Sequence, residues 1–281
     1  RVSSSAASDV YKRQDLYVAE VNKIWLFKDV EDNLKKYDEV GFYPEDPILI
    51  SDEFPSDKHH GWKYISVGPD NKLYVPVGAP CNICESRDEI YSTITRMDLD
   101  GSNREIFARG VRNTVGFTWH PETGEMWFTD NGRDMLGDNY PPCELNRISK
   151  PNEHYGYPYC HGGNISDPEF GSKYPCDDFI KPVQNLGPHV APLGVKFYNG
   201  NMFPEEYRGD VFIAEHGSWN RTKKIGYRIT RVKIDGNKSL GYEPFIYGWL
   251  EKDKNDAWGR PVDLVFLVDG SMLISDDYAN V

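Results

Sequence analysis

The sequence predicts an all-β fold of the β-propeller type. A β-rich phrase recurs along the chain at intervals of roughly 55 residues, which favours a ring of small sheets over a sandwich. Aromatic residues make up 14% of the chain, alongside 25 Gly and 19 Pro, a composition typical of short strands joined by many turns. No amphipathic helix longer than about two turns is apparent. An irregular β-sandwich is the alternative architecture.

Each copy of the phrase has a β-rich triplet followed by small or polar residues. Turn signals such as PDN, ETGE and VDG precede several copies. The longest interval between copies contains a Pro-, Gly- and Cys-rich insertion over residues 134–189. The five predicted strands lie at Leu16, Leu73, Met126, Val211 and Met272. Second strands that contain arginine follow three copies, at residues 93–101, 144–150 and 227–236.

The five copies predict about five recognisable blades, each burying its faces against its neighbours. Residues 1–14, RVSSSAASDVYKRQ, are interpreted as a non-native or disordered leader. Residues 15–281 are then expected to form one β-propeller domain. Because strand patterns begin abruptly at Asp15 and stop abruptly at Val281, we expect a ring truncated at both ends.

Charge and hydrophobicity exclude several classes of partner. The chain has 32 basic and 44 acidic residues, a net charge of -12, which disfavours nucleic acid or an anionic membrane as the main partner. No run of 18 or more apolar residues occurs, so we expect no membrane span. A locally basic pocket for a small anionic ligand stays compatible with this balance.

The five cysteines favour an oxidising compartment, either extracellular or periplasmic, because they lie in loops beside Pro and Gly. The CxxC pair, Cys81 and Cys84, lacks two further ligands in zinc-site spacing, so we expect no zinc site there. Cys160 and Cys176 flank one irregular loop, and we predict a disulfide between them. Cys143 could pair with Cys81 or Cys84.

Polar residues at strand ends would converge on one face of a propeller. His59 and His60 precede a strand, and on extended backbone at most one of them faces a given pocket. Arg112 and Asn113 offer a planar fork of donors and an amide, which suit carboxylates or quinone oxygens. Residues 129–139 form an oxygen-rich loop that could bind calcium, although the loop lacks the EF-hand pattern. The alternatives are a solvated or structural histidine and an ordinary loop cap.

Five segments in chain order resemble the soluble quinoprotein sugar dehydrogenases, most closely their sorbosone dehydrogenase-like branch. The match runs from Asp15 to the last residue. The resemblance implies a six-bladed propeller that holds pyrroloquinoline quinone (PQQ) and calcium at the top of its channel. The segments are HHGWKYISVGPDNKLYVPVG, VRNTVGF, TDNGRD followed by ELNRI, EHYGYP, and GRPVDL.

The resemblance also implies roles for individual residues. His60 corresponds to the catalytic base, and Arg112 with Asn113 to the pair beneath the cofactor. The backbone carbonyls of Gly132 and Arg133 correspond to the calcium ligands.

Other positions match the family less closely. Arg260 corresponds to an arginine that reaches the cofactor. The family's cofactor lysine has no clear match, and Arg221, His216 and Lys223 occupy its neighbourhood. His154 departs from the family's turn sequence.

The implied reaction is oxidation of a sugar, polyol or sugar aldehyde by hydride transfer to PQQ, with calcium as Lewis acid. His60 would take the hydroxyl proton, and Arg112 would stabilise charge on the quinone. An external acceptor would then remove the electrons. The alternatives are a calcium-dependent lactonase-type hydrolase, using carboxylates such as Asp130 and Glu215, and a non-catalytic binding propeller.

Overall fold

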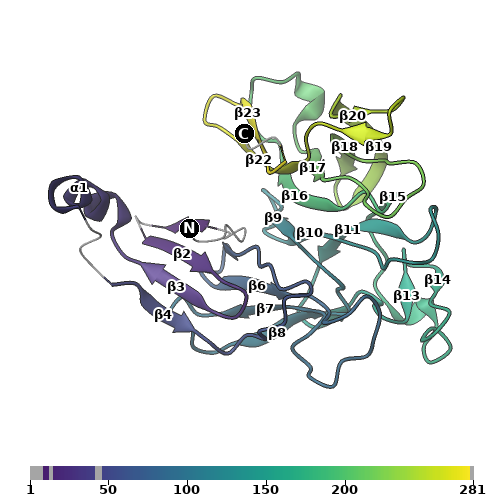
Figure 1. Ribbon diagram of the computed structural model, residues 1–281, viewed down its shortest axis with the longest axis horizontal. Coiled ribbons are helices and arrows are strands. Elements are labelled where there is room, and N and C mark those ends of the chain that lie inside the picture. The colour runs from purple at the N-terminus through teal and green to yellow at the C-terminus, as the bar shows by residue number, and fades with distance from the viewer. Residues whose placement is uncertain (1–8, 13–14, 42–45, 279–281) are drawn as a thin grey trace. The chain divides into compact units, whose positions relative to one another are not determined.

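The computed structural model describes residues 9–12, 15–41 and 46–278, and these residues form mainly short β-strands (Figure 1). The chain divides into two compact units, residues 1–107 and 108–281. The boundary falls inside one strand, β8 (Glu105–Arg109).

The first unit contains two sheets in which strands adjacent in sequence lie side by side. One sheet is antiparallel and consists of β1 (Asp9–Lys12), β2 (Asp15–Ala19), β3 (Ile24–Phe27) and β4 (Ile48–Ser51). The other consists of β5 (Ser66–Val67), β6 (Leu73–Val77), β7 (Thr93–Met97) and β8. One core joins the two sheets, with Ile24 and Leu26 from the first packed together with Leu73, Val75 and Met97 from the second.

The second unit repeats this arrangement. Its first sheet consists of β9 (Gly116–Trp119), β10 (Met126–Asp130), β11 (Pro142–Ile148) and β15 (Gln184–Pro188). The next consists of β16 (Pro192–Phe197), β17 (Val211–Glu215), β18 (Arg228–Asp235) and β19 (Lys238–Tyr247). Both are antiparallel. β22 (Pro261–Phe266) and β23 (Met272–Asp276) pair as a final hairpin.

Shorter elements connect these sheets. β12 (Glu153–His154) pairs with the last two residues of β8, which belong to the second unit. β13 (Cys160–His161) and β14 (Ile165–Ser166) form a small hairpin, as do β20 (Leu250–Glu251) and β21 (Asp256–Ala257). Two 3-10 helices occur at Cys176–Asp178 and Glu205–Tyr207.

Two apolar clusters hold the sheets of the second unit together. Trp127 and Leu145 from one sheet pack with Val195, Val211 and Ile213 from the next. A separate cluster, rich in aromatic residues, packs Tyr198, Phe212 and Ile229 against Leu264 and neighbours from the final hairpin. Gly116 in β9 allows a close approach between sheets, because a Cβ there would lie 2.0 Å from the carbonyl oxygen of Leu193 in β16.

The all-β prediction is confirmed, and the five predicted strands lie in β2, β6, β10, β17 and β23. Each of these strands belongs to a different sheet. The three arginine-containing segments supply β7, β11 and β18, the partners of three of those strands. The six blades and the truncation remain predictions.

The expectation that no helix exceeds two turns is wrong, because α1 (Val30–Val40) has 11 residues. Its apolar positions do not form a buried stripe. Leu34 and Tyr37 are about half exposed, whereas the polar Asn33 is buried. The helix ends at Gly41, whose positive φ of 77° allows its N–H to donate to the Tyr37 carbonyl. Val30, Leu34 and Tyr37 nevertheless follow the i, i+4, i+7 spacing of a helix, a pattern that the sequence contains.

Part of the predicted leader is a strand. Asp9–Lys12 forms β1, which pairs with β2 from Asp9 opposite Val18 to Lys12 opposite Asp15. Disorder therefore does not describe these four residues. Residues 1–8 and 13–14 lie outside the described residues. The non-native origin of residues 1–14 and the single propeller domain over 15–281 remain predictions.

Two disulfides form. The predicted Cys160–Cys176 bond is confirmed, with the two Cα atoms 5.4 Å apart. The predicted pairing of Cys143 with Cys81 or Cys84 is wrong, because Cys81 and Cys84 bond to each other. Cys143 is a buried free cysteine in β11, packed in the core of the second unit, and burial raises the pKa of its thiol to about 11.

Candidate active site

A buried carboxylate organises the first group of candidate residues. The Asp130 side chain lies at the end of β10 and accepts the backbone N–H of Arg112 at 2.8 Å and that of Asn113 at 2.6 Å. The Asn131 amide donates to the carbonyls of Asn113 and Pro192, at 3.0 and 3.2 Å. These bonds fix the Arg112–Asn113 turn against the loop that follows β10.

The Arg112 guanidinium also contacts the loop after β10, and it is almost completely buried. Its Nη1 donates to the carbonyls of Asn131 and Gly132, at 3.1 and 2.9 Å, and its Nη2 contacts Asp134 at 3.3 Å. Gly132 itself is tightly placed, since a Cβ there would lie 2.7 Å from the Pro142 carbonyl oxygen. Glycine is therefore required at the centre of this loop.

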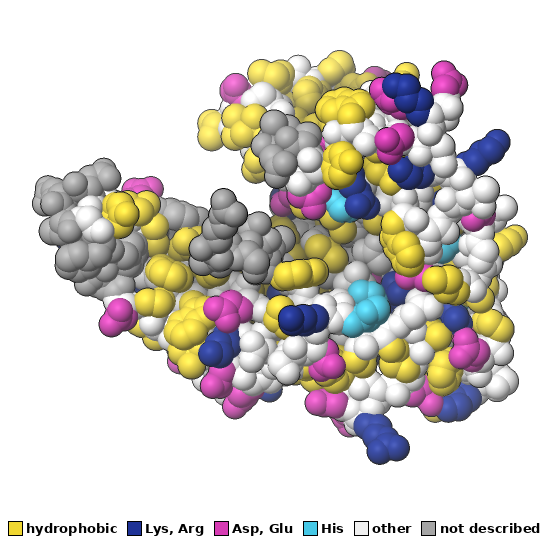
Figure 2. Space-filling view, in the orientation of Figure 1, with side chains coloured by type: hydrophobic (Ala, Val, Ile, Leu, Met, Phe, Trp, Pro, Cys, Tyr) yellow, Lys and Arg dark blue, Asp and Glu magenta, His cyan; other side chains and the backbone are white. Residues whose placement is uncertain are grey.

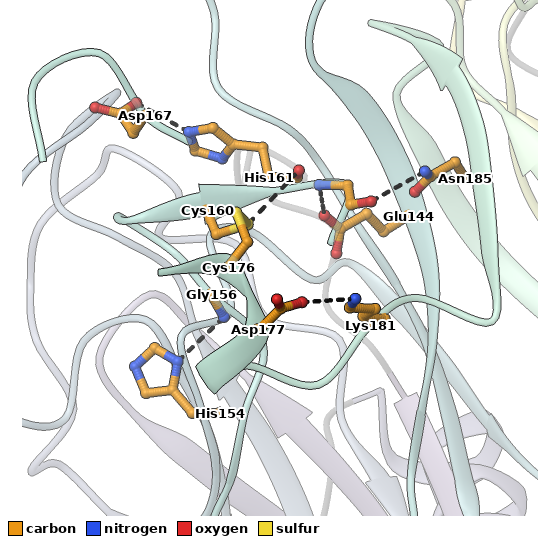
Figure 3. Close-up of a disulfide and its surroundings, with 11 residues drawn as sticks. Glu144, His154, Gly156, Cys160, His161, Asp167, Cys176, Asp177, Lys181 and Asn185 are labelled. Atoms are coloured by element: carbon orange, nitrogen blue, oxygen red, sulfur yellow. Dashed lines mark hydrogen bonds and ion pairs between the residues drawn. A yellow bond between two sulfur atoms is a disulfide. The ribbon is translucent and has the colours of Figure 1, made fainter. Parts of the chain in front are cut away.

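Arg133, the next residue, turns its side chain toward the segment that contains the Cys160–Cys176 disulfide. Its guanidinium is buried and donates to Asp167 at 2.6 Å and to Glu169 at 3.0 Å. The ring of His161 also contacts Asp167, at 2.9 Å from Nε2 (Figure 3). Burial lowers the pKa of His161, so the neutral ring donates from Nε2 to this carboxylate.

Two buried carboxyl groups lie beneath the loop. Glu144 in β11 is directly opposite Asp130 in β10. Burial raises the pKa of Asp130 to about 6, against the backbone N–H bonds that favour its ionised form. Burial, together with the negative charge of Asp130, raises the pKa of Glu144 to about 7. The site therefore holds acidic groups whose charge changes near neutral pH.

Two residues that the sequence did not place in the site, Asn220 and His189, complete the polar network. Asn220 donates to Asp134 at 2.6 Å and also contacts His189, at 3.3 Å from Nδ1. The Nε2 atom of His189 contacts the Gly137 carbonyl at 2.9 Å. Because these partners are far apart in sequence, the only sequence signal for Asn220 was its position beside the predicted residue Arg221.

Arg221 lies close to Asp138, whose carboxylate accepts the backbone N–H of Thr222 at 3.2 Å. The Arg221 Nε donates to the Lys223 carbonyl, while its Nη1 is a buried nitrogen with no hydrogen-bond partner among the described residues. A buried donor without a partner is unusual, since it carries the full cost of lost hydration.

Arg260 is held by the main chain at the end of β17. Its Nε donates to the His216 carbonyl at 3.0 Å and its Nη2 to the Gly217 carbonyl at 3.1 Å. The ring of His216 contacts Asp277 at 2.8 Å. The backbone N–H of His216 donates to the Ala191 carbonyl, which places this group two residues from His189 in the chain.

His60 belongs to the first unit and has a left-handed backbone with φ of 51°. The expectation of extended backbone at His59 and His60 is therefore wrong, and the two rings are 4.0 Å apart. The Nδ1 atom of His60 contacts the Ala79 carbonyl at 2.9 Å. His60 is half-buried and His59 is exposed, but their predicted relation to Arg112 stays a prediction.

The same segment contains a buried lysine that sequence reasoning missed. Lys63 donates to the Gly61 carbonyl at 3.3 Å and lies over the Phe54 ring. Burial lowers the pKa of its amine to about 8. A lysine that loses its proton this close to neutral pH is a candidate functional group. Only the neighbouring His59 and His60 drew attention to this segment.

The structure thus brings together Arg112, Asn113, Gly132, Arg133 and, through Asn220, the segment of Arg221. Two cavities in the second unit, of about 530 and 540 Å³, are lined by other residues, among them His120 and Glu205 in one and Arg228 and Tyr247 in the other. The candidate site is the hydrogen-bonded network around the loop after β10, because Arg112, Gly132 and Arg133 meet there. On the face shown in Figure 2, Lys and Arg side chains are interspersed with Asp and Glu.

Comparison with known proteins gives a family match. The model of the TrAA12-like family matches residues 89–280. A Borreliella burgdorferi protein of uncharacterised function is 40% identical over 278 residues, covering 96% of this chain and 72% of its own. A pyrroloquinoline quinone-dependent pyranose dehydrogenase of Coprinopsis cinerea is 26% identical over 223 residues, covering 61% of this chain and 30% of that protein.

Solved structures resemble the fold. The iodide and calcium structures of a Trichoderma reesei enzyme of Carbohydrate-Active Enzymes Family AA12 give TM-scores of 0.79 and 0.76, both at 19% identity. Each covers 97% of this chain and 78% of the other. Within the described residues, no helix combines the length and apolar character needed to cross a membrane.

Proposed function

The chain belongs to the TrAA12-like family and is an oxidoreductase, and from this premise we propose that it oxidises a sugar, polyol or sugar aldehyde with PQQ and calcium. Its sequence favours the sorbosone dehydrogenase-like branch within this chemistry. The proposal includes a six-bladed ring of which this chain lacks parts, and an extracellular or periplasmic location. The two disulfides support that location.

One observation carries the proposal: the buried Nη1 of Arg221 has no partner among the described residues, next to Thr222, whose N–H is held by Asp138. PQQ carries several carboxylates, and a guanidinium is the donor best suited to them. Arg112 and Arg260 supply two more guanidinium groups in the same unit. These residues fit an anionic cofactor.

The loop after β10 also fits calcium, which binds backbone carbonyls and carboxylates. The candidate ligands are the carbonyl oxygens of Gly132 and Arg133, with the Asp134 carboxylate nearby. The Gly132 carbonyl also accepts a bond from Arg112, but a carbonyl oxygen has a second lone pair. Bound here, calcium would supply Lewis acidity, and PQQ would supply a quinone that accepts hydride.

The chain's own residues would then handle the proton and the charge. Because the Ala79 carbonyl can only accept a hydrogen bond, the His60 ring carries its proton on Nδ1. Its Nε2 therefore keeps a lone pair that can take the proton of a substrate hydroxyl. Arg112, held by Asp134 and two carbonyls, is pre-organised to stabilise negative charge.

The test is reconstitution. The purified protein, with and without an extended native chain, is titrated with PQQ and calcium and assayed with a dye acceptor and a panel of sugars, polyols and sugar aldehydes. We expect dye reduction that needs PQQ, calcium and a substrate together. PQQ binding with no dye reduction by any substrate in either form would contradict the proposed activity.

A further inference from the structure

The segment closed by the Cys160–Cys176 disulfide, here called the disulfide loop, has an arrangement that the proposed reaction does not itself require. It begins with the β13–β14 hairpin and ends at the 3-10 helix Cys176–Asp178 (Figure 3). A backbone bond from the Asp167 N–H to the Tyr159 carbonyl ties its middle to its start, at 2.9 Å. The disulfide then fixes its other end.

Asp167 is the polar centre of this loop, and its side chain is completely buried. One carboxylate oxygen accepts the backbone N–H groups of Glu169 and Phe170, at 2.8 and 3.0 Å. The other accepts from Arg133 and His161. With four donors on its two oxygens, this carboxylate is the fixed anchor of the Arg133 guanidinium.

The disulfide loop has a second attachment to the site. The Gly162 N–H donates to Glu144 at 2.7 Å, and the Gly162 carbonyl accepts from Asn185 at 3.1 Å (Figure 3). Glu144 lies opposite Asp130, which holds the Arg112–Asn113 turn. The disulfide loop therefore contacts both the Arg133 side chain, through Asp167, and strand β11, through Glu144.

We propose that the disulfide loop positions the Gly132–Arg133 carbonyls for calcium, with Asp167 acting as a positioning residue through the Arg133 side chain. This inference rests on the proposed function, because it takes those carbonyls as ligands. A backbone carbonyl points where the conformation of its chain directs it. In this proposal the Arg133 guanidinium, fixed by the buried Asp167, sets the direction in which the Arg133 peptide faces.

A purely stabilising role explains this arrangement less well. Burying two charges costs about as much as their attraction returns, so a buried ion pair is poor support for stability alone. Partners that orient metal ligands, in contrast, typically change metal affinity about 10- to 100-fold when removed. Both side chains of the Arg133–Asp167 pair are buried, and Arg133 directly follows Gly132 in the chain.

The experiment measures calcium affinity by calorimetry on the purified protein and its variants, without substrate. We expect Asp167→Asn to weaken calcium binding about 10- to 100-fold. The matched control is Asp177→Asn, the same change at an exposed carboxylate of the adjoining 3-10 helix that pairs with Lys181. That control should keep the wild-type affinity. Unfolding temperatures without calcium are recorded for each variant.

Two further variants separate positioning from folding. Glu169→Gln removes the exposed partner of Arg133 and should weaken calcium binding only about two- to threefold, because exposed ion pairs are weak. If Asp167 acts through Arg133, the double variant Asp167→Asn/Arg133→Met should bind calcium no more weakly than Arg133→Met alone. Independent, additive losses would overturn the positioning role.

The disulfide is tested by Cys160→Ser/Cys176→Ser, which should also weaken calcium binding, with Cys81→Ser/Cys84→Ser, which removes the other disulfide, as the control. If the wild-type protein binds calcium and Asp167→Asn binds it equally well, the inference is wrong and the proposed function stands. If the wild-type protein binds no calcium, the calcium part of the proposed function fails and the inference fails with it. Should Asp167→Asn not fold, Glu169→Gln and Arg133→Met decide the question, and wild-type calcium affinity in both would overturn the inference.

Discussion

Two of the regions that contain predicted site residues are built differently. Around the loop after β10, candidate groups are held from several directions: Asp130 accepts two backbone N–H groups, and Arg112 donates to three acceptors. In the segment His59–Lys63, the His60 ring contacts the Ala79 carbonyl and the Lys63 amine donates to the Gly61 carbonyl. In the proposed reaction the first region is the scaffold that holds ligands, and the second supplies nitrogens that exchange protons.

The largest effect should come from His60 in the second region. His60→Ala should lower turnover about 10²- to 10⁴-fold, because it removes the proposed base, while PQQ binding stays unchanged. Turnover is measured by dye reduction and binding by the absorbance of PQQ. His59→Ala is the control and should retain activity. Equal losses in both variants would break the distinction between the two histidines.

A change in the scaffold should affect PQQ binding, in contrast to the change at His60. Arg112→Gln should weaken PQQ binding about 10- to 100-fold, the loss expected for one or two charge-assisted hydrogen bonds. It should also lower the unfolding temperature, since the Asn131 and Gly132 carbonyls lose their donor. Arg104→Gln, which alters a surface pair with Glu53, is the control for both measurements. A normal PQQ affinity would remove Arg112 from the cofactor site.

The buried amine of Lys63 should make the stability of the first unit depend on pH. Its pKa is about 8 in the folded protein and about 10.5 when unfolded, so the unfolded chain binds more protons between these values and stability rises with pH across that window. Below pH 8 the cost of the buried charge is fully present. Lys63→Met should therefore stabilise the protein at pH 7 by about 2 kcal/mol, and less at pH 10.

Denaturant unfolding at the two pH values measures this effect, with the exposed Lys58→Met as the control. A stabilised variant that also loses dye reduction would show that the first unit keeps this buried amine for function. A variant without stabilisation would contradict the lowered pKa.

The smallest effect concerns His154 beside the scaffold. Burial, aided by Arg109, lowers its pKa from 6.5 to about 4. The folded state therefore disfavours the charged ring, and its contribution to stability is lost as pH falls from about 6.5 through 4. His154→Phe should flatten this part of the stability profile by about 1 kcal/mol, measured by tryptophan fluorescence. His59→Phe should leave the profile unchanged.

Sequence reasoning recovered features whose signals are local. The strand phrases became strands of five different sheets. Arg112 donates to the Gly132 carbonyl, which joins two of the predicted segments, while the roles of these residues stay predictions. The helix α1 was missed although Val30, Leu34 and Tyr37 have helical spacing. The CxxC bond was missed because proximity in sequence carries no information on side-chain direction.

The missing parts of the site depend on contacts between distant segments. Asp167 meets Arg133 across 34 residues, and Asn220 meets Asp134 across 86. Neither partner belongs to a motif. Their significance comes from burial and from the groups opposite them, which only the folded arrangement supplies.

Cys143 gives the protein an internal reporter. It is the one cysteine outside a disulfide, it is fully buried, and the main chain of Gly132 and Ala191 partly offsets the rise that burial causes in the pKa of its thiol. A thiol reagent can alkylate it only when the core of the second unit opens, so the labelling rate measures how often that opening occurs. A calcium ion bound to the neighbouring Gly132 carbonyl should slow the labelling. The alkylation rate of this one thiol would then report how much of the protein has an ion bound at the loop.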